Sequence, residues 1–220
     1  PLEPDPLGFV DTRDYADRLA DASSKSGESE AVLVGTARIG GLAAVLAVMD
    51  FGFLGGSMGL EVGRRVSEAA ELALVQRIPL VVVCTSGGAR MQEGVFSLLQ
   101  MARTAQAFAR LRERGILSVC VLTDPTYGGV SASFANLGAV VVAERGAHVG
   151  FAGPRVVKET IRAELPDDFQ TAEFLLEHGL VDRVESRADL RPLLVRLLDL
   201  HARGTRTRGL TLVDTVVADP

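Results

Sequence analysis

Three glycine-rich turns are the parts of this sequence whose residue types and spacing best suit chemistry. Each turn follows a predicted strand and precedes a predicted helix. The first N–H groups of a helix have no acceptor within the helix and carry the positive end of its dipole. Two such N–H groups can hold an oxyanion and stabilise a transition state. The turns are Gly55-Gly56-Ser57-Met58-Gly59, Ser86-Gly87-Gly88 and Tyr127-Gly128-Gly129.

The same glycines also have a structural interpretation, in which they form tight turns and let helices pack closely on a sheet. Three pairs at the same kind of junction favour a site over packing alone. The sequence contains no G-x-x-x-x-G-K-[ST] motif and no G-x-G-x-x-G that opens a helix. An NTP-binding loop and a dinucleotide fingerprint are therefore not predicted.

The first turn matches G-x-S-x-G, the nucleophile elbow of the α/β-hydrolases, with Ser57 in the nucleophile position. Asp124 and His148 follow in the order that a hydrolase needs. A glycine-rich run produces this pattern by chance, however, and no HGGG-like oxyanion loop precedes it. A serine hydrolase stays open as a minor alternative.

Charged residues near the turns have mainly structural interpretations. Glu93 and Glu144 are expected to be capping or surface carboxylates, and Arg90 follows the second turn at a spacing that lets it pair with Glu93. Cys84 and Cys120 lie in apolar runs and are expected to be buried, reduced thiols, which suits a cytoplasmic enzyme.

Composition excludes several classes of protein. The net charge of -5 argues against a nucleic-acid-binding surface, and no apolar run is long enough for a transmembrane helix. Without any C-x-x-C motif, a cysteine-based zinc site is not expected.

Apolar runs alternate with helical periodicity along the chain, which predicts an α/β fold with a mostly parallel sheet. Residues 31–51 are expected to form two strands joined at Gly40-Gly41. Further strands are predicted at 80–84, 117–123, 140–143 and 148–151. Helices are predicted at 12–22, 60–76, 95–114, 130–137, 154–164, 170–178 and 188–203.

Six segments carry a resemblance to the β subunit of bacterial acetyl-CoA carboxylase carboxyltransferase. They are DPLGFVDTRDYADRL (5–19), FLGGSMG (53–59), SGGARMQEG (86–94), LTDPTYGGVSASFANLG (122–138), GFAGPRVVKETIRAELPDDFQ (150–170) and GLVD (179–182). The resemblance implies the ClpP/crotonase-like fold of repeated β-β-α units. It also implies one carboxyltransferase domain over residues 1–220, with a lead-in at 1–12 and a tail at 204–220.

The family resemblance implies that carboxybiotin on a carrier protein gives its CO2 to the α-carbon of acetyl-CoA, which yields malonyl-CoA for fatty acid biosynthesis. The biotin ureido anion can itself take the α-proton, so no side-chain base is required. By resemblance, the N–H groups of Gly87 and Gly88 hold the thioester oxygen, and Gly128-Gly129 shapes the wall where the substrates meet. The expected coenzyme A contacts are Phe53, Gly55, Gly56, Ser57, Met58, Gly59 and Arg90.

The resemblance also implies partners: a carboxyltransferase α subunit with the second oxyanion hole, a biotin carboxyl carrier protein and an ATP-dependent biotin carboxylase, in an α2β2 hetero-oligomer. Neither a membrane nor a nucleic acid is expected. The family's four-cysteine zinc ribbon is missing from this sequence, so no metal is expected. Two further alternatives stay open: the β subunit of a decarboxylase acting on a malonyl thioester, and a non-catalytic assembly subunit.

Overall fold

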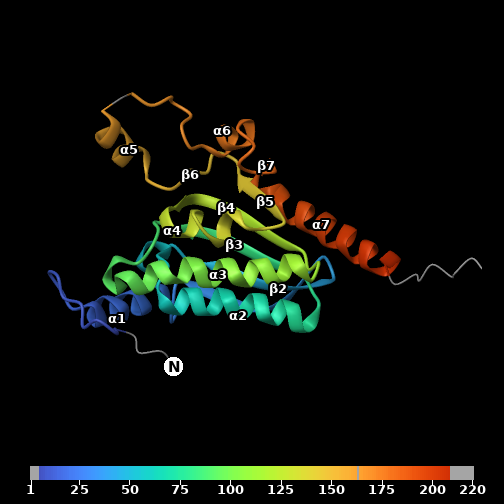
Figure 1. The fold of residues 1–220 in the computed structure, drawn as a ribbon, viewed down its shortest axis with the longest axis horizontal. Helices are drawn as coiled ribbons and strands as arrows, with labels where there is room; N and C mark the ends of the chain where they lie inside the picture. The colour runs from blue at the N-terminus through green and yellow to red at the C-terminus, as the bar shows by residue number, and fades with distance from the viewer. Residues whose placement is uncertain (1–4, 163, 209–220) are drawn as a thin grey trace, which may run out of the picture.

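The computed structural model describes residues 5–162 and 164–208, and in this part the chain forms a seven-stranded sheet with helices on both faces (Figure 1). Six strands lie in the order β1-β2-β3-β4-β5-β7, and β6 pairs with the end of β4. The strands are β1 (Val32–Ile39), β2 (Leu42–Met49), β3 (Leu80–Ser86), β4 (Ser118–Tyr127), β5 (Val140–Glu144), β6 (Val149–Gly150) and β7 (Arg183–Glu185).

The first two strands form a hairpin, and all other pairings in the sheet are parallel. Gly40 and Gly41 connect β1 to β2 with φ angles of 59° and 84°, which favour glycine at both central positions of a two-residue turn. The predicted pair of strands joined at Gly40-Gly41 and the mostly parallel sheet are confirmed.

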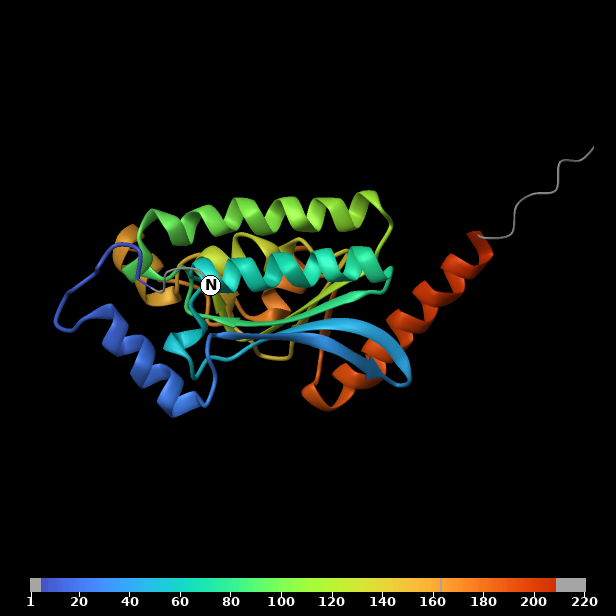
Figure 2. The ribbon, with the colours of Figure 1, turned by 90° about the horizontal axis from the view of Figure 1, so that it is seen from below.

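Two long helices, α2 (Leu60–Gln76) and α3 (Val95–Glu113), lie side by side across one face of the sheet (Figures 1 and 2). A stripe of small and branched residues on α2 is buried because its spacing follows the helical period. The stripe comprises Val62, Val66, Ala69, Ala70 and Ala73. The last helix, α7 (Arg187–Arg208), lies on the other side of the sheet (Figure 2).

Each central strand supplies side chains to both faces, because successive residues of a strand point to opposite sides. Leu80, Val82 and Cys84 of β3 join the large core beneath α2 and α3, whereas Val81 packs in the second cluster with Leu193 and Leu198 of α7. Burial raises the pKa of both cysteine thiols, to about 12 for Cys120. Both cysteines are buried and form no disulfide, as predicted.

The remaining elements differ from the predictions mainly at their ends. The first helix, α1 (Tyr15–Ser26), begins and ends later than expected, and the helix predicted at 130–137 is a short α4 (Gly128–Ser131) followed by a 3-10 turn, Phe134–Asn136. Strand β7 was not predicted. The other short helices are α5 (Pro154–Ile161) and α6 (Ala172–Glu177). No helix in the described part of the chain is both long enough and apolar enough to cross a membrane.

The single-domain assignment stays a prediction. Residues 1–4 of its lead-in and 209–220 of its tail lie outside the described residues.

Candidate active site

The three glycine turns meet at one edge of the sheet. The short 3-10 helix Leu54–Gly56 follows β2, the second turn follows Ser86 at the end of β3, and the third begins at Tyr127 at the end of β4. Because β2, β3 and β4 are parallel neighbours, their carboxyl ends lie together, which is where open α/β sheets commonly bind ligands.

Three backbone hydrogen bonds join the first two turns. The Gly87 N–H donates to the Gly55 carbonyl at 2.8 Å, the Met58 N–H to the Gly88 carbonyl at 2.8 Å, and the Arg90 N–H to the Met58 carbonyl at 2.9 Å. Gly56 has a φ of 63°, and a Cβ there would lie 2.2 Å from the carbonyl oxygen of Thr85. Glycine is therefore required for these two turns to approach so closely.

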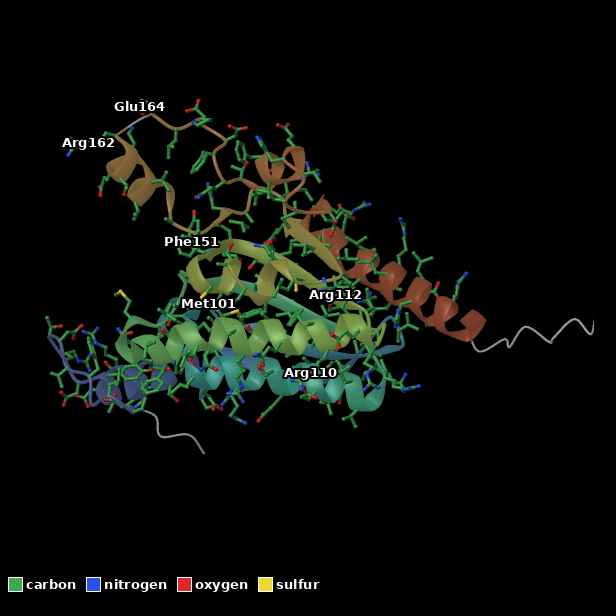
Figure 3. All side chains as sticks on the ribbon, viewed as in Figure 1. Met101, Arg110, Arg112, Phe151, Arg162 and Glu164 are labelled. Atoms are coloured by element: carbon green, nitrogen blue, oxygen red, sulfur yellow. The ribbon has the colours of Figure 1, made fainter. Side chains whose placement is uncertain are left out.

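The second and third turns touch through their backbones. A Cβ on Gly128 would lie 2.8 Å from the Gly88 Cα, and a Cβ on Gly129 would lie 3.2 Å from the Ala89 Cβ. The third turn is held from its other side, because the Gly128 N–H donates to the Phe151 carbonyl at 2.9 Å. Figure 3 labels Phe151 where the chain leaves β6 toward α5. The glycines therefore allow the three turns to pack closely, as the structural interpretation of these residues predicted.

The N–H groups of Gly87 and Gly88, which are the predicted oxyanion donors, both form hydrogen bonds within the chain. The Gly87 N–H donates to the Gly55 carbonyl, and the Gly88 N–H donates to the Ser86 Oγ at 2.9 Å. Both groups therefore have acceptors within the chain, and the assignment of the thioester oxygen to them stays a prediction.

Two other N–H groups suit the oxyanion better. The Gly88 carbonyl and the Arg90 N–H both bond to Met58 in a parallel bridge. Because neighbouring backbone groups of a strand point to opposite sides, the N–H of Ala89 points away from Met58. In the described part of the chain, no hydrogen bond from the Ala89 N–H is found. Gly129 lies in the first turn of α4, where its N–H has no acceptor within the helix.

The N–H groups of Ala89 and Gly129 both lie beside the contact between Gly88 and Gly128. A Cβ on Gly128 would lie 3.7 Å from the Ala89 nitrogen, and a Cβ on Gly88 would lie 3.7 Å from the Gly129 nitrogen. The arrangement can hold one oxygen between the N–H of Ala89 in the bridge and the N–H of Gly129 at the start of α4. Sequence reasoning found Gly129 but missed Ala89, because nothing in the residue types shows which amide of a turn points outward.

Most of the predicted coenzyme A contacts lie inside the protein. Phe53 and Met58 are buried, as are Gly56 and Gly59, and Arg90 is 1% exposed. The side chains of Phe53, Met58 and Arg90 lie buried beneath the turns, and the coenzyme A contacts assigned to them stay a prediction. The predicted residues that reach the surface, each only in part, are Gly55 and Ser57.

Arg90 is the centre of a buried polar network. Its guanidinium donates to both carboxylate oxygens of Glu30, at 2.9 and 2.5 Å, and to Glu93 at 3.4 Å. It also donates to the Tyr15 hydroxyl at 3.2 Å. Burial opposes its charge, but hydrogen bonding and Coulomb attraction to Glu30 outweigh burial and raise the pKa of Arg90.

Glu93 has the capping role that the sequence suggested, although it is buried rather than at the surface. Its Oε2 accepts from the Leu60 N–H at 2.5 Å, at the start of α2, and its Oε1 accepts from the Tyr15 hydroxyl at 2.6 Å. The pairing with Arg90 is confirmed. Glu144 pairs with Arg187 and lies away from the turns.

The structure does not support the hydrolase alternative. The Ser57 Oγ accepts a hydrogen bond from the Arg90 Nε at 3.1 Å, and a guanidinium that stays protonated cannot act as a base. Asp124 and His148 do pair, at 3.0 Å at an exposed position, but in the described part of the chain no hydrogen bond joins His148 to Ser57.

Known proteins with similar sequences and structures share this fold. The model of the carboxyl transferase domain family matches residues 8–172. The chain is 59% identical over 201 residues, 91% of its length, to the acetyl-coenzyme A carboxylase carboxyl transferase subunits beta/alpha of Saccharopolyspora erythraea. It is 54% identical over 203 residues, 92% of its length, to the beta subunit of Gloeobacter violaceus, of which it covers 67%.

Solved structures show the same fold. Transcarboxylase 12S superposes with a TM-score of 0.69 at 29% identity, over 76% of this chain and 33% of that one. A Pseudomonas malonate decarboxylase heterodimer superposes with a TM-score of 0.68 at 25% identity, over 82% of this chain and 85% of that one.

The chain spans about a third of the length of the beta/alpha relatives, 35% in the Saccharopolyspora protein. The family model matches residues 8–172, which is most of this chain and includes all three glycine turns. The chain therefore belongs to the carboxyl transferase family, and its sheet has the crotonase-like fold of that family.

Proposed function

We propose that this chain forms the acyl-CoA half of an acetyl-CoA carboxyltransferase, as the β-type subunit. It moves CO2 from carboxybiotin on a carrier protein to the α-carbon of acetyl-CoA, and the product is malonyl-CoA. The names of the relatives support this substrate. The observation that carries the proposal is a pair of N–H groups for which no acceptor is found in the described part of the chain, those of the partly exposed Ala89 and the buried Gly129, at the contact between two glycine turns.

The reaction needs an oxyanion site more than it needs a side-chain base. When CO2 leaves the N1 atom of carboxybiotin, the ureido group is left as an anion that takes a proton from the acetyl α-carbon. The enolate then attacks CO2 to form the new C–C bond. During this step the thioester oxygen becomes negative, and the N–H groups of Ala89 and Gly129 would stabilise it.

Gly87, Gly88 and Gly128 have a supporting part in this proposal. Their lack of a side chain lets the second and third turns come into contact, and the hydrogen bond from Gly87 to Gly55 fixes the first turn against the second. Phe51 (45% exposed) lies just before the partly exposed Gly55 and Ser57. We propose that coenzyme A passes over this segment.

A partner subunit fits an exposed apolar patch that follows the second turn. Met91 is 81% exposed and Val95 is 60% exposed, and Leu98 and Leu99 on α3 are about half exposed. A patch of this kind beside a site commonly marks a protein interface. We propose that an α subunit covers it and supplies a second oxyanion hole for the biotin ureido group.

The remaining parts of the assembly are also proposals. They are a biotin carboxyl carrier protein, a biotin carboxylase, an α2β2 arrangement and a place in the cytoplasm. Likewise, the expectation that the chain binds no zinc stays a prediction, which metal analysis of the purified protein would test.

Replacing one amide by an ester tests the proposed donors directly. Ala89 is replaced by lactic acid, or Gly129 by glycolic acid, through nonsense suppression, so the N–H is lost while the side chain stays the same. Removing one oxyanion donor typically lowers kcat by about 10²–10³-fold. We expect this loss for either replacement in the complex with a co-expressed α-type subunit, assayed as acetyl-CoA release from malonyl-CoA and biotin.

The control is an ester at Gly146, an exposed turn glycine whose N–H donates to the exposed Glu173 carboxylate and to no residue of the three glycine turns. A full rate after the Ala89 and Gly129 replacements would rule out these donors. Release of CO2 from a malonyl thioester without biotin would favour the decarboxylase alternative. Activity that needs the chain but is insensitive to both esters would favour a non-catalytic assembly subunit.

A further inference from the structure

Arg90 connects four segments of the chain that are far apart in sequence. Its side chain bonds to Glu30, which precedes β1, and to Tyr15 on α1, and it donates to the Ser57 carbonyl oxygen at 2.8 Å and to the Ser57 Oγ at 3.1 Å. Its own N–H donates to the Met58 carbonyl. Backbone and side chain of this one residue therefore hold the first glycine turn from two directions.

The residue before Arg90 is Ala89, whose N–H is a proposed oxyanion donor. The direction of that N–H depends on the bridge to Met58, because the flanking groups of Gly88 and Arg90 both bond to Met58. Any rotation of the Arg90 backbone that breaks this bridge also turns the Ala89 peptide. The orientation of the donor thus depends on how firmly Arg90 is anchored.

The anchor is rigid because every charge in it has partners. The buried network contains two carboxyl groups and one guanidinium, and a backbone N–H donates to each carboxyl group. Glu30 Oε1 accepts from the Ala31 N–H at 2.7 Å, and Glu93 Oε2 accepts from the Leu60 N–H at the positive end of the α2 dipole. The Phe53 ring lies under the guanidinium, 5.6 Å from its carbon to the ring centroid.

We infer that Arg90 is a positioning residue, which orients the Ala89 N–H toward the thioester oxygen by holding the Gly55–Gly59 and Ser86–Arg90 turns together through Glu30 and Ser57. This inference rests on the proposed function for its catalytic consequence. The planar guanidinium serves the Glu30 carboxylate and both Ser57 acceptors at once. A lysine ammonium has the charge but not this fork of donors.

The test is Arg90→Lys in the complex with the α-type subunit. A displacement of about 1 Å at a reacting group can lower a rate by about 10²-fold, so we expect kcat to fall by about that factor while the KM for malonyl-CoA stays close to the wild-type value. Amide hydrogen exchange is the second measurement. The amides of Gly87, Met58 and Arg90 should exchange faster, because all three form the bonds between the turns.

Arg65→Lys is the matched control. Arg65 also ties β1 to a helix, with bonds to the Val32 carbonyl, Ser29 and Glu61, but it does not contact the glycine turns. It should leave kcat and the exchange of the three amides unchanged. Tyr15→Phe is a second variant, in case Arg90→Lys folds poorly. It removes only the hydroxyl between Arg90 and Glu93 and should cause a smaller change in the same direction.

The outcomes separate the inference from the proposed function. Arg90→Lys with lowered Tm but with wild-type kcat and unchanged exchange at the three amides would overturn the inference. If the wild-type complex shows no carboxyl transfer, the proposed function fails. The exchange measurement then still decides whether Arg90 holds the turns.

Discussion

Two arginine–glutamate networks in this molecule have similar composition but different surroundings. In one, Arg90 pairs with Glu30 beneath the glycine turns, and both side chains are 5% exposed or less. In the other, Arg64 and Arg65 pair with Glu61 along the surface of α2, with side chains between 24% and 32% exposed. The bonds have similar lengths, at 2.5 Å between Arg90 and Glu30 and 2.8 Å between Arg65 and Glu61.

Because the bond lengths are similar, burial rather than bond length distinguishes the effect of these two networks on stability and position. Water screens the surface network, and each member has alternative partners in the solvent. The buried network has only its protein partners, so removing one leaves an uncompensated charge in the interior. Only the buried network can therefore transmit a precise position to the neighbouring backbone.

The largest expected effect is the loss of a buried carboxylate. Glu30→Ala leaves Arg90 charged and without its main partner, so the free energy of unfolding should fall by about 3–5 kcal/mol. Glu61→Ala on the surface of α2 should cost about 1 kcal/mol or less. Urea unfolding of both variants at neutral pH makes the comparison. Equal losses in the two variants would contradict the distinction between the networks.

A smaller effect is expected from crowding the buried network. A Cβ on Gly59 would lie 2.3 Å from the Glu93 Oε1, so Gly59→Ala must displace the carboxylate that caps α2. We expect it to lower the free energy of unfolding by about 1–3 kcal/mol and to lower the transfer rate. Thermal unfolding of Gly35→Ala provides the control, since a Cβ at Gly35 has no neighbour within 4 Å. An unchanged Tm for Gly59→Ala would show that the network adapts easily.

The smallest effect concerns pH and the surface network. Hydrogen bonding from Arg64 lowers the pKa of Glu61 from 4.5 to about 2. A depressed folded-state pKa stabilises the protein above the unfolded value near 4.5, and the benefit disappears as the pH falls through about 2. Glu61→Gln should therefore cost about 1 kcal/mol at pH 7 and nothing near pH 2.

Glu113→Gln, an exposed carboxylate on α3, is the control for this pH series. It should follow the wild type at each pH in urea unfolding. A Glu61→Gln deficit that stays constant down to pH 2 would show that the ion pair is not its source.

The networks also show how far sequence reasoning could reach. The Arg90–Glu93 pair was predictable because the two residues are three positions apart and share a turn. Glu30 was not, because 60 positions separate it from Arg90 and no periodicity connects them. Arg90 was expected to contact coenzyme A on the basis of the family resemblance, and its burial depends on Glu30, a partner that only the folded chain supplies.

Most strands and the two long helices could be predicted from the sequence, because apolar runs and the helical spacing of apolar residues indicate which faces are buried. The prediction at 60–76 matches α2 in both bounds, and the prediction at 95–114 misses α3 by one residue. The short β7 was missed because three residues carry too little periodicity to register.

The sequence by itself determined the family, the positions of the three glycine turns and the parallel sheet that brings them to one edge. Which N–H groups of those turns form hydrogen bonds within the described part of the chain became clear only from the folded structure. The N–H groups of Gly87 and Gly88 donate to Gly55 and Ser86, whereas no acceptor for those of Ala89 and Gly129 is found among the residues that the structure describes. Residue types report the conformations that a backbone can adopt, but the direction of a peptide N–H depends on the acceptors that the folded chain places around it.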